Sequence, residues 1–280
     1  MAGDKKRVAV IGAGMVGIAA ASWLLRDGHE VTVIDPEPPG SGASFGNAGC
    51  FNPSSIVPVA GPGTLRKVPG YLADPLGPLC IRWRYLPALT PWLARFIRAG
   101  TPERIEAQAR ALKPLLAPCL DSVMELARSA GAQSLIARNG ILIAYRTQTA
   151  WDDDRRAWDL RRRNGIQWEE LDADELRQFD PNLSRDFVRG KLVPANGHCL
   201  DPGGLVAALA EAVQHAGGRL LRRRATGFSF DGVRLRAVQT PDGDVPADAA
   251  VIAAGAHSRP HAASAGDRVP LDRASWIITQ

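Results

Sequence analysis

The stretch from Arg7 to Asp35 limits most strongly what this chain can fold into. It begins with an apolar run, Val8 to Ile11, that is typical of a buried strand. Glycines at positions 12, 14 and 17 then match the pattern G-x-G-x-x-G, and an Ala-rich apolar segment of helical character extends to Asp27. A second apolar run, Val31 to Ile34, ends at Asp35. This order of strand, glycine-rich turn, helix and strand predicts a βαβ unit that binds a dinucleotide.

The residue types in this unit have separate expected tasks. Gly12 permits the tight turn out of the strand, Gly14 lets a pyrophosphate approach the main chain, and Gly17 lets the helix pack closely on the sheet. The first N–H groups of the helix, at its positive end, form an anion site. Asp35 lies 18 residues after Gly17, a spacing that suits hydrogen bonds to an adenosine ribose and disfavours NADP. The predicted cofactor-binding residues here are Gly12, Ala13, Gly14, Met15, Val16, Gly17, Asp35 and Pro36.

The same stretch has the hydropathy of a membrane segment. Val8 to Leu25 is an uncharged run of 18 residues that follows Lys5, Lys6 and Arg7, as in a signal sequence or a membrane helix. Three glycines at the motif spacing argue for the dinucleotide-binding turn instead. We therefore expect a soluble cytoplasmic protein, with peripheral contact at the inner face of the cell membrane left open.

Composition sets wider limits. The chain has 280 residues, 45% of them hydrophobic, and a net charge of +5, which fits one large domain or two. Basic clusters at 161–163 and 222–224 are expected on solvated faces of a helix and a strand; an acidic membrane surface or an anionic substrate is the alternative. The sequence contains no recognised nucleic-acid-binding module, so we expect no nucleic acid as a partner. Four isolated cysteines and five scattered histidines favour a reducing compartment and predict no metal site.

Residues 36–80 are rich in Pro, Gly and Ser and are expected to be mostly irregular. Within them Ser41 to Cys50 reads SGASFGNAGC. Small residues and free N–H groups directly after the ribose-binding acid suit a phosphate or a ring system. An ordinary surface loop is the alternative interpretation.

Further elements follow from periodicity and capping. Asp172 and Glu175 form a capping box, and Asp201 with Pro202 opens another helix that Gly217 and Gly218 end. Helices are expected over 83–99, over 102–130 with breaks near Pro114 and Pro118, over 149–164, after Asp172 as far as Pro181, and over 203–216. Strands are expected over 140–145, 190–194, 219–223, 227–230 and 249–254.

Several motifs together resemble FAD-dependent D-amino-acid dehydrogenases, within the group of D-amino-acid and glycine/sarcosine oxidases. The resemblance covers nearly all of residues 6–272. Its motifs are VAVIGAGMVG…GHEVTVID, SFGNAG, PGTLRK, PLGPLCIRW, LDPGGLVAALAEAVQHAGG, RATGF and ADAAVIAAGAHS. The first is shared by many nucleotide binders, whereas the ordered set is specific. The resemblance adds Ser44, Asn47, Ala48, Gly49, Ala225, Ala254 and Gly255 to the expected FAD contacts, with Ala225 on an adenine-side strand.

The resemblance implies a reaction and a fold. Such enzymes oxidise a D-amino acid by hydride transfer to flavin, giving a 2-oxo acid and ammonia, and pass electrons to a quinone or respiratory carrier. The implied fold is α/β: a Rossmann-like FAD-binding domain interleaved with an α+β substrate domain. The implied segments are 1–60 with 195–265 for FAD, 61–194 for substrate, and a divergent end, 266–280. No catalytic residue is identified.

The C-terminal sequence VPLDRASWIITQ departs from the family after Asp272. We therefore expect an incomplete substrate domain and impaired activity. Three alternatives stay open: a flavin amine oxidase for glycine, sarcosine or hydroxyproline; a non-catalytic nucleotide-binding remnant; and an NAD-dependent dehydrogenase, which the SFGNAG loop disfavours.

Overall fold

The computed structural model describes residues 4–58 and 86–269. The segments PGTLRK and PLGPLCIRW, and nearly all of VPLDRASWIITQ, lie outside the described residues. The chain divides into two compact units: unit 1 holds Met1–Gly49, Ser122–Ala137 and Cys199–Gln280, and unit 2 holds Cys50–Asp121 and Arg138–His198. Residues 122–137 thus belong to unit 1. The boundaries of the FAD-binding and substrate domains expected from the sequence stay predictions.

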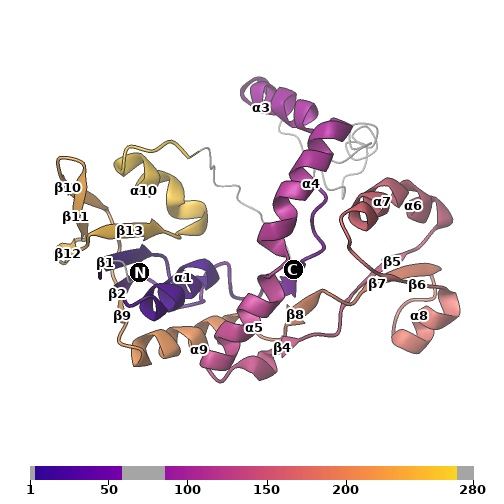
Figure 1. Ribbon diagram of the computed structural model, residues 1–280, viewed down its shortest axis with the longest axis horizontal. Coiled ribbons are helices and arrows are strands. Elements are labelled where there is room, and N and C mark those ends of the chain that lie inside the picture. Colours follow the sequence, from indigo (N-terminus) through magenta and orange to yellow (C-terminus); the bar gives the residue numbers. More distant parts are fainter. Residues whose placement is uncertain (1–3, 59–85, 270–280) are drawn as a thin grey trace. The chain divides into compact units, whose positions relative to one another are not determined.

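A parallel sheet of four strands forms the centre of unit 1 (Figure 1). Its order is β13 (Ala249–Ile252), β1 (Arg7–Ile11), β2 (Glu30–Ile34) and β9 (Arg219–Leu221). Helix α1 (Met15–Arg26) connects β1 to β2, and Ile11 pairs with Ile34 in parallel register. The predicted βαβ unit and the α/β fold are confirmed.

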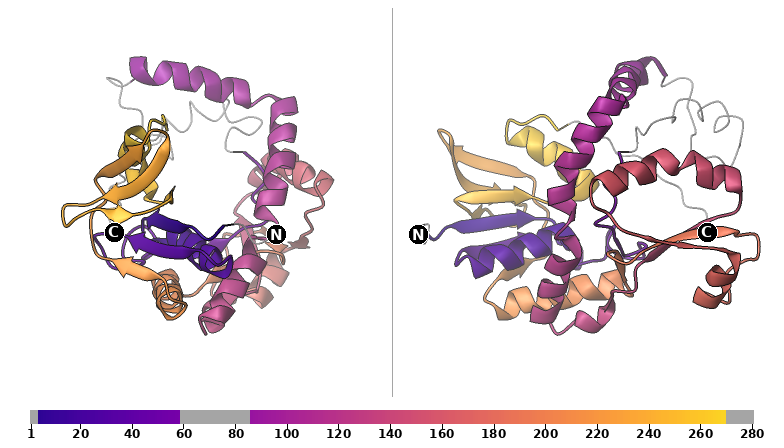
Figure 2. Two further views of the ribbon diagram at one scale, coloured as in Figure 1. Left: turned by 60° about the vertical axis from the view of Figure 1, so that its left-hand side comes forward. Right: turned by 45° about the vertical axis from the view of Figure 1, so that its right-hand side comes forward.

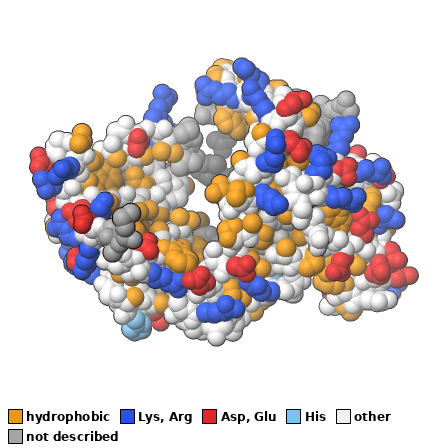
Figure 3. Space-filling model, viewed as in Figure 1, with side chains coloured by type: hydrophobic (Ala, Val, Ile, Leu, Met, Phe, Trp, Pro, Cys, Tyr) orange, Lys and Arg blue, Asp and Glu red, His pale blue; other side chains and the backbone are white. Residues whose placement is uncertain are grey.

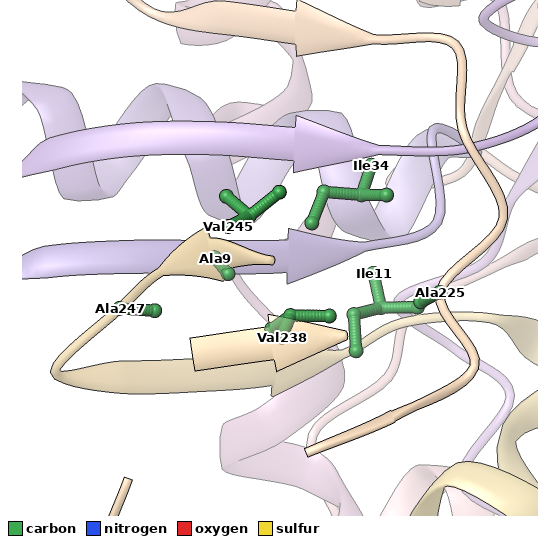
Figure 4. Close-up of a cluster of buried hydrophobic side chains, with 7 residues drawn as sticks. All are labelled: Ala9, Ile11, Ile34, Ala225, Val238, Val245 and Ala247. Atoms are coloured by element: carbon green, nitrogen blue, oxygen red, sulfur yellow. The ribbon is translucent and has the colours of Figure 1, made fainter. Parts of the chain in front are cut away.

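Both faces of this sheet are covered. Ala9, Ile11 and Ile34 pack against a second sheet, which is antiparallel and consists of β10 (Gly227–Asp231), β11 (Arg234–Gln239) and β12 (Val245–Pro246). Figure 4 shows the buried cluster between the two sheets. Because side chains alternate along a strand, Val8 and Val10 point to the opposite face, where α1 and α9 (Pro202–His215) pack (Figure 2, left).

Local capping accounts for the helix ends that the sequence predicts. Asp201 Oδ1 accepts a hydrogen bond from the Gly204 N–H at 2.9 Å, which confirms Asp201 as the N-cap of α9. Gly28 follows α1 with φ +86°, a conformation that glycine adopts without strain. The other elements of unit 1 are the 3₁₀ helix Gln133–Leu135, β4 (Ile136–Ala137), the 3₁₀ helix Gly255–His257 and α10 (Ser258–Ser264).

Unit 2 is built around a small antiparallel sheet in the order β5 (Ile141–Tyr145), β7 (Arg189–Val193) and β6 (Glu169–Leu171). Its helices are α3 (Leu86–Ala99), α4 (Pro102–Leu116), α6 (Gln148–Asp153), α7 (Arg155–Arg163) and α8 (Ala173–Phe179), and its other strands are β3 (Cys50–Phe51) and β8 (Gly197–Cys199). Strand β8 ends at the boundary between the units in the sequence, and α5 (Cys119–Ser129) crosses that boundary along the chain. The capping box at Asp172 and Glu175 is present with both of its hydrogen bonds.

The single helix expected over 149–164 is wrong. The structure has two helices, α6 and α7, which meet at Asp154. The Asp154 carboxylate accepts hydrogen bonds from the Tyr145 hydroxyl at 2.7 Å and from Trp158 Nε1 at 2.9 Å. These tertiary partners hold Asp154 in place, and burial raises the pKa of Tyr145 far above its usual value.

The expected solvated face at Arg161–Arg163 holds for Arg162 and Arg163, which are exposed, but not for Arg161, which is half-buried. The Arg161 and Arg162 guanidinium groups stack over the rings of Trp158 and Trp168, at 4.5 and 5.0 Å from the ring centres. Lys191 of β7, whose side chain is 5% exposed, lies near the rings of Trp151, Trp158 and Trp168 and 3.4 Å from Glu170. Desolvation lowers its pKa. Lys191 and, in part, Arg161 therefore pack among the aromatic rings inside unit 2.

Other differences concern element ends. Helix α4 continues through Pro114 and ends before Pro118, where the predicted second break occurs. Strand β9 ends at Leu221, so Arg222–Arg224 are not part of a strand. Strands β3, β6, β8, β11 and β12 and helix α10 are not predicted by the sequence pattern. In the described ranges no helix has the length and apolarity needed to cross a membrane, and Val8–Leu25 forms β1 and most of α1.

Candidate functional site

The predicted cofactor-binding residues of unit 1 follow the carboxyl ends of parallel strands. Residues 12–17 follow β1, Asp35 and Pro36 follow β2, Ala225 comes after β9, and Ala254 and Gly255 come after β13. Because these strands are parallel neighbours, their carboxyl ends lie at one edge of the sheet. In α/β proteins this edge is where ligands bind.

Two glycines of the motif are required by the protein's own packing. Gly12 has φ +112°, and a Cβ there would lie 2.5 Å from the Ala253 carbonyl oxygen. A Cβ on Gly17 would lie 1.9 Å from the Gly12 carbonyl oxygen. Any side chain at either position therefore collides with main-chain atoms, because the turn, the helix and the end of β13 pack closely together.

Gly14 differs from these two glycines. Its φ is −77°, which any residue adopts, and the nearest atom to an added Cβ is Ser44 Oγ at 3.5 Å. The protein's packing therefore leaves room for a side chain at Gly14. The packing around Gly14 therefore does not itself require glycine, and the expected approach of a pyrophosphate to this main chain stays a prediction.

The same position offers hydrogen-bond donors. Gly14 is the N-cap of α1 and supplies no side-chain cap, so the first N–H groups of the helix have no intrahelical partner. One of them, the Met15 N–H, donates to Ser44 Oγ at 3.1 Å. Together with the positive end of the helix dipole, this turn is suited to an anion.

Asp35 connects the glycine-rich turn to the end of β2. Its Oδ2 accepts from the Ala13 N–H at 2.8 Å, and its Oδ1 accepts from the Glu37 N–H at 2.9 Å. Each carboxylate oxygen has a second lone pair with which to accept a hydrogen bond from a hydroxyl. Asp35 is half-buried, at the edge where the strands end.

The SFGNAG loop reaches the motif through Ser44, whose Oγ accepts from the Met15 N–H. Asn47 bonds within its own loop, donating to the Ala43 and Ser44 carbonyls and accepting from the Gly49 N–H at 2.7 Å. Gly49 has φ +62° and accepts from the Cys199 N–H at 2.8 Å. These hydrogen bonds of Asn47 and Gly49 shape the loop and hold it beside the segment before α9.

Ala225 departs from the expected strand. It lies between β9 and β10, with its side chain buried against Ile11 and Val238 in the cluster of Figure 4. The Ala254–Gly255 segment follows β13 directly, and Gly255 has φ +54°. The residue before this segment, Ala253, brings its carbonyl close to Gly12.

The sequence interpretation overlooked two contributors to this geometry. The Gly40 N–H donates to the Ala13 carbonyl at 3.0 Å, and the Leu221 carbonyl accepts from the Asp35 N–H at 3.1 Å. The Pro-Pro-Gly sequence before Ser41 signals a turn at Gly40. No local pattern signals Leu221, because its role comes from the pairing of β2 with β9.

The site fits a dinucleotide with an apolar ring system. The first turn of α1 presents N–H groups without intrahelical partners next to Gly14, Asp35 has capacity to accept hydroxyl hydrogen bonds, and two apolar side chains nearby in sequence are exposed. These are Val16, 71% exposed, and Phe45, 74% exposed. Such exposure suits contact with a flat, partly apolar ligand.

Comparisons with known proteins agree with this geometry. The family model described as FAD dependent oxidoreductase matches residues 7–277. The chain is 47% identical over 274 residues to a D-amino-acid oxidase of Bradyrhizobium diazoefficiens, covering 96% of this chain and 64% of the relative. It is 34% identical to D-amino acid dehydrogenase 2 of Ralstonia nicotianae, covering 90% of this chain and 61% of the relative. The chain therefore spans less than two thirds of the length of these relatives.

Solved structures share the fold. Glycine oxidase from Geobacillus kaustophilus matches with a TM-score of 0.63 and 24% identity, over 94% of this chain and 59% of that one. L-amino acid deaminase from Proteus vulgaris, with its specific insertion deleted, matches with a TM-score of 0.68 and 16% identity, over 95% and 57%. The chain belongs to the DAO family of FAD dependent oxidoreductases.

Proposed function

We propose that this chain carries the FAD-binding part of an enzyme that oxidises D-amino acids to 2-oxo acids and ammonia. The observation that carries the proposal is the open space at Gly14, bordered by the uncapped first turn of α1 and by Ser44 Oγ. An N-terminal helix end with such a space is suited to the pyrophosphate of FAD.

Different residues of the chain bind different parts of the cofactor. The amides after Gly14 bind the pyrophosphate, and Asp35 accepts from the adenosine ribose hydroxyls while it keeps the turn in place through Ala13. Ala225 and the Ala254–Gly255 segment border the ligand at the same sheet edge. Val16 and Phe45 cover apolar parts of it. Asn47, Ala48 and Gly49 set the shape of the loop that presents Ser44.

The 47% identity to a protein named D-amino-acid oxidase supports D-amino acids as the substrate class. Bound FAD supplies the acceptor for a hydride from the substrate's α-carbon. Loss of this hydride and of an amine proton gives an imino acid, which water hydrolyses to the 2-oxo acid and ammonia.

Two electron acceptors are consistent with the names of the relatives. Several relatives are named D-amino acid dehydrogenases, which favours the quinone or respiratory carrier that the sequence resemblance implies. The relative that is 47% identical is named an oxidase, which favours molecular oxygen. A quinone acceptor brings with it contact with a membrane surface, and we include that contact in the proposal.

The test is turnover of a panel of D- and L-amino acids by FAD-saturated protein. A redox dye measures dehydrogenase activity, and peroxide formation measures oxidase activity in parallel. We expect 2-oxo acid and ammonia in equal amounts from D-amino acids only. Turnover of glycine or sarcosine alone would favour the amine-oxidase alternative, and tight FAD binding without turnover would favour a non-catalytic role.

A further inference from the structure

Helix α3 in unit 2 has an apolar face that the described structure buries only in part. Its hydrophobic residues recur at the spacing of one helical face: Leu89, Trp92, Leu93, Phe96 and Ile97. None of the five side chains is buried; Trp92 is 54% exposed and Ile97 46% exposed. The Trp92 and Phe96 rings stack with their centres 5.0 Å apart. A 14-residue helix therefore presents an aromatic and aliphatic stripe to its surroundings.

The charge of this helix has one sign. Arg95 and Arg98 are exposed and lie together, three residues apart, away from the apolar stripe, and the helix contains no Asp or Glu. The surrounding sequence has the same bias: residues 59–100 contain six Lys or Arg and one Asp. Their net charge of +5 equals that of the whole chain, so the rest of the sequence is neutral overall. The occupant that complements α3 is therefore anionic.

The separation of the two faces distinguishes between anionic occupants. Nucleic acid binding requires cations beside stacking aromatic rings on one surface. On α3 the cations lie apart from a stripe that also contains leucine and isoleucine. An apolar stripe with Trp and a cationic opposite face is the pattern of a helix that lies in the headgroup region of a bilayer. In the view of Figure 3, hydrophobic and basic side chains both lie on the surface at the place where Figure 1 draws α3.

We propose that α3 is a membrane-contacting helix that binds the surface of a bilayer containing anionic lipids. Trp92, Phe96 and Ile97 enter the boundary between headgroups and acyl chains, and Arg95 and Arg98 bind lipid phosphates. This deepens the membrane contact within the proposed function, on which it rests. The surface consists of α3 alone and uses no residue of the cofactor site.

The test is co-sedimentation of the whole chain with vesicles of phosphatidylcholine, with and without phosphatidylglycerol. We expect binding only with phosphatidylglycerol, and weaker binding as salt rises. Arg95→Gln and Arg98→Gln should each weaken binding by about fivefold, the usual effect of one basic residue near an anionic surface. Trp92→Gln with Ile97→Gln should weaken it by at least about tenfold, since two large apolar side chains no longer insert.

Matched controls are Val233→Gln and Arg156→Gln, which alter an exposed apolar residue and an exposed cation outside α3. Both should bind like the wild type. Bromine-labelled lipids should quench the protein's fluorescence less in Trp92→Phe than in the wild type. Vesicle binding needs neither FAD nor substrate. A chain that does not bind vesicles would therefore leave the oxidoreductase proposal intact, and a chain without turnover would leave the membrane-binding proposal intact.

Three results would overturn the proposal. The α3 variants could bind vesicles as strongly as the wild type. The same variants could instead abolish self-association in the absence of lipid, which would make α3 an interface between copies of this chain. Single-stranded DNA could bind at α3 and displace the vesicles, which would make it a nucleic-acid surface.

Discussion

The Ala13 main-chain N–H donates a hydrogen bond to Asp35 Oδ2 at 2.8 Å, across 22 residues of sequence. This bond fastens the glycine-rich turn after β1 to the end of β2, and Gly40 binds the Ala13 carbonyl from the other side. Asp35 therefore supports the turn as well as facing the expected ribose site. Replacing it should affect both cofactor binding and the shape of the turn.

Asp35→Ala should weaken FAD binding by about 1–3 kcal/mol, because polar partners in the turn and in the ligand lose their acceptor. Asp35→Asn, which keeps one acceptor oxygen, should lose less. Titration of the chain with FAD, followed by flavin fluorescence, measures both. Glu37→Ala removes the same charge two residues away and should leave the affinity unchanged. An unaltered affinity in Asp35→Ala would contradict the ribose assignment.

Gly14→Val and Gly17→Ala should separate ligand binding from folding. The space at Gly14 admits a side chain, so Gly14→Val should fold with nearly unchanged Tm and lose the stabilisation that FAD gives. At Gly17 even a methyl group meets the Gly12 carbonyl, so Gly17→Ala should lose about 3 kcal/mol or more of unfolding free energy. Thermal melting with and without FAD measures both. A Gly14→Val protein with the wild-type FAD-induced shift would place the phosphates elsewhere.

Asp154→Ala should destabilise unit 2. It removes the carboxylate acceptor of the Tyr145 hydroxyl, while Trp158 Nε1 keeps its second acceptor, the Tyr145 hydroxyl oxygen at 2.7 Å, so the expected cost is about 1–3 kcal/mol. Tyr145→Phe should cost less, because Trp158 Nε1 keeps its bond to Asp154. Denaturant unfolding followed by Trp fluorescence measures the change, and Asp186→Ala, an exposed carboxylate, is the control. Equal stability of Asp154→Ala and Asp186→Ala would show that the buried network contributes little.

The Arg7–Asp248 pair should contribute to stability in a pH-dependent way. Asp248 accepts from the Arg7 N–H at 2.9 Å, from Nε at 3.1 Å and from Nη2 at 2.6 Å, and these hydrogen bonds hold the pKa of Asp248 far below its usual value. A carboxylate with a lowered folded-state pKa stabilises the fold above its unfolded pKa of about 3.9. That contribution is lost as the pH falls through the folded value.

Asp248→Asn should therefore lower Tm at neutral pH, and its difference from the wild type should shrink in strong acid. Tm measured across the acid range checks this, with Asp244→Asn as an exposed control. A difference that stays constant from neutral to strongly acidic pH would show that the pair does not act through ionised Asp248.

Features that depend on neighbouring residues in the chain could be predicted from the sequence. The βαβ unit follows from apolar runs and glycine spacing, and the starts of α8 and α9 follow from the caps at Asp172 and Asp201. In the candidate site, the positive φ of Gly12 follows from the same motif. These features arise from hydrogen bonds and steric limits within a few residues, so a local pattern contains them.

The other features of the fold and of the candidate site depend on tertiary structure. The break at Asp154 depends on Tyr145, the place of Ser44 depends on a hydrogen bond to Met15, and the order of β13, β1, β2 and β9 depends on non-local pairing. The different requirements at Gly14 and Gly17 become visible only from the atoms around them. The sequence alone determined that a nucleotide-binding turn forms. Contacts between distant segments decided which main-chain atoms close that turn and which leave space for a ligand. The reason is that tertiary packing brings together residues that lie far apart in the sequence and share no local pattern.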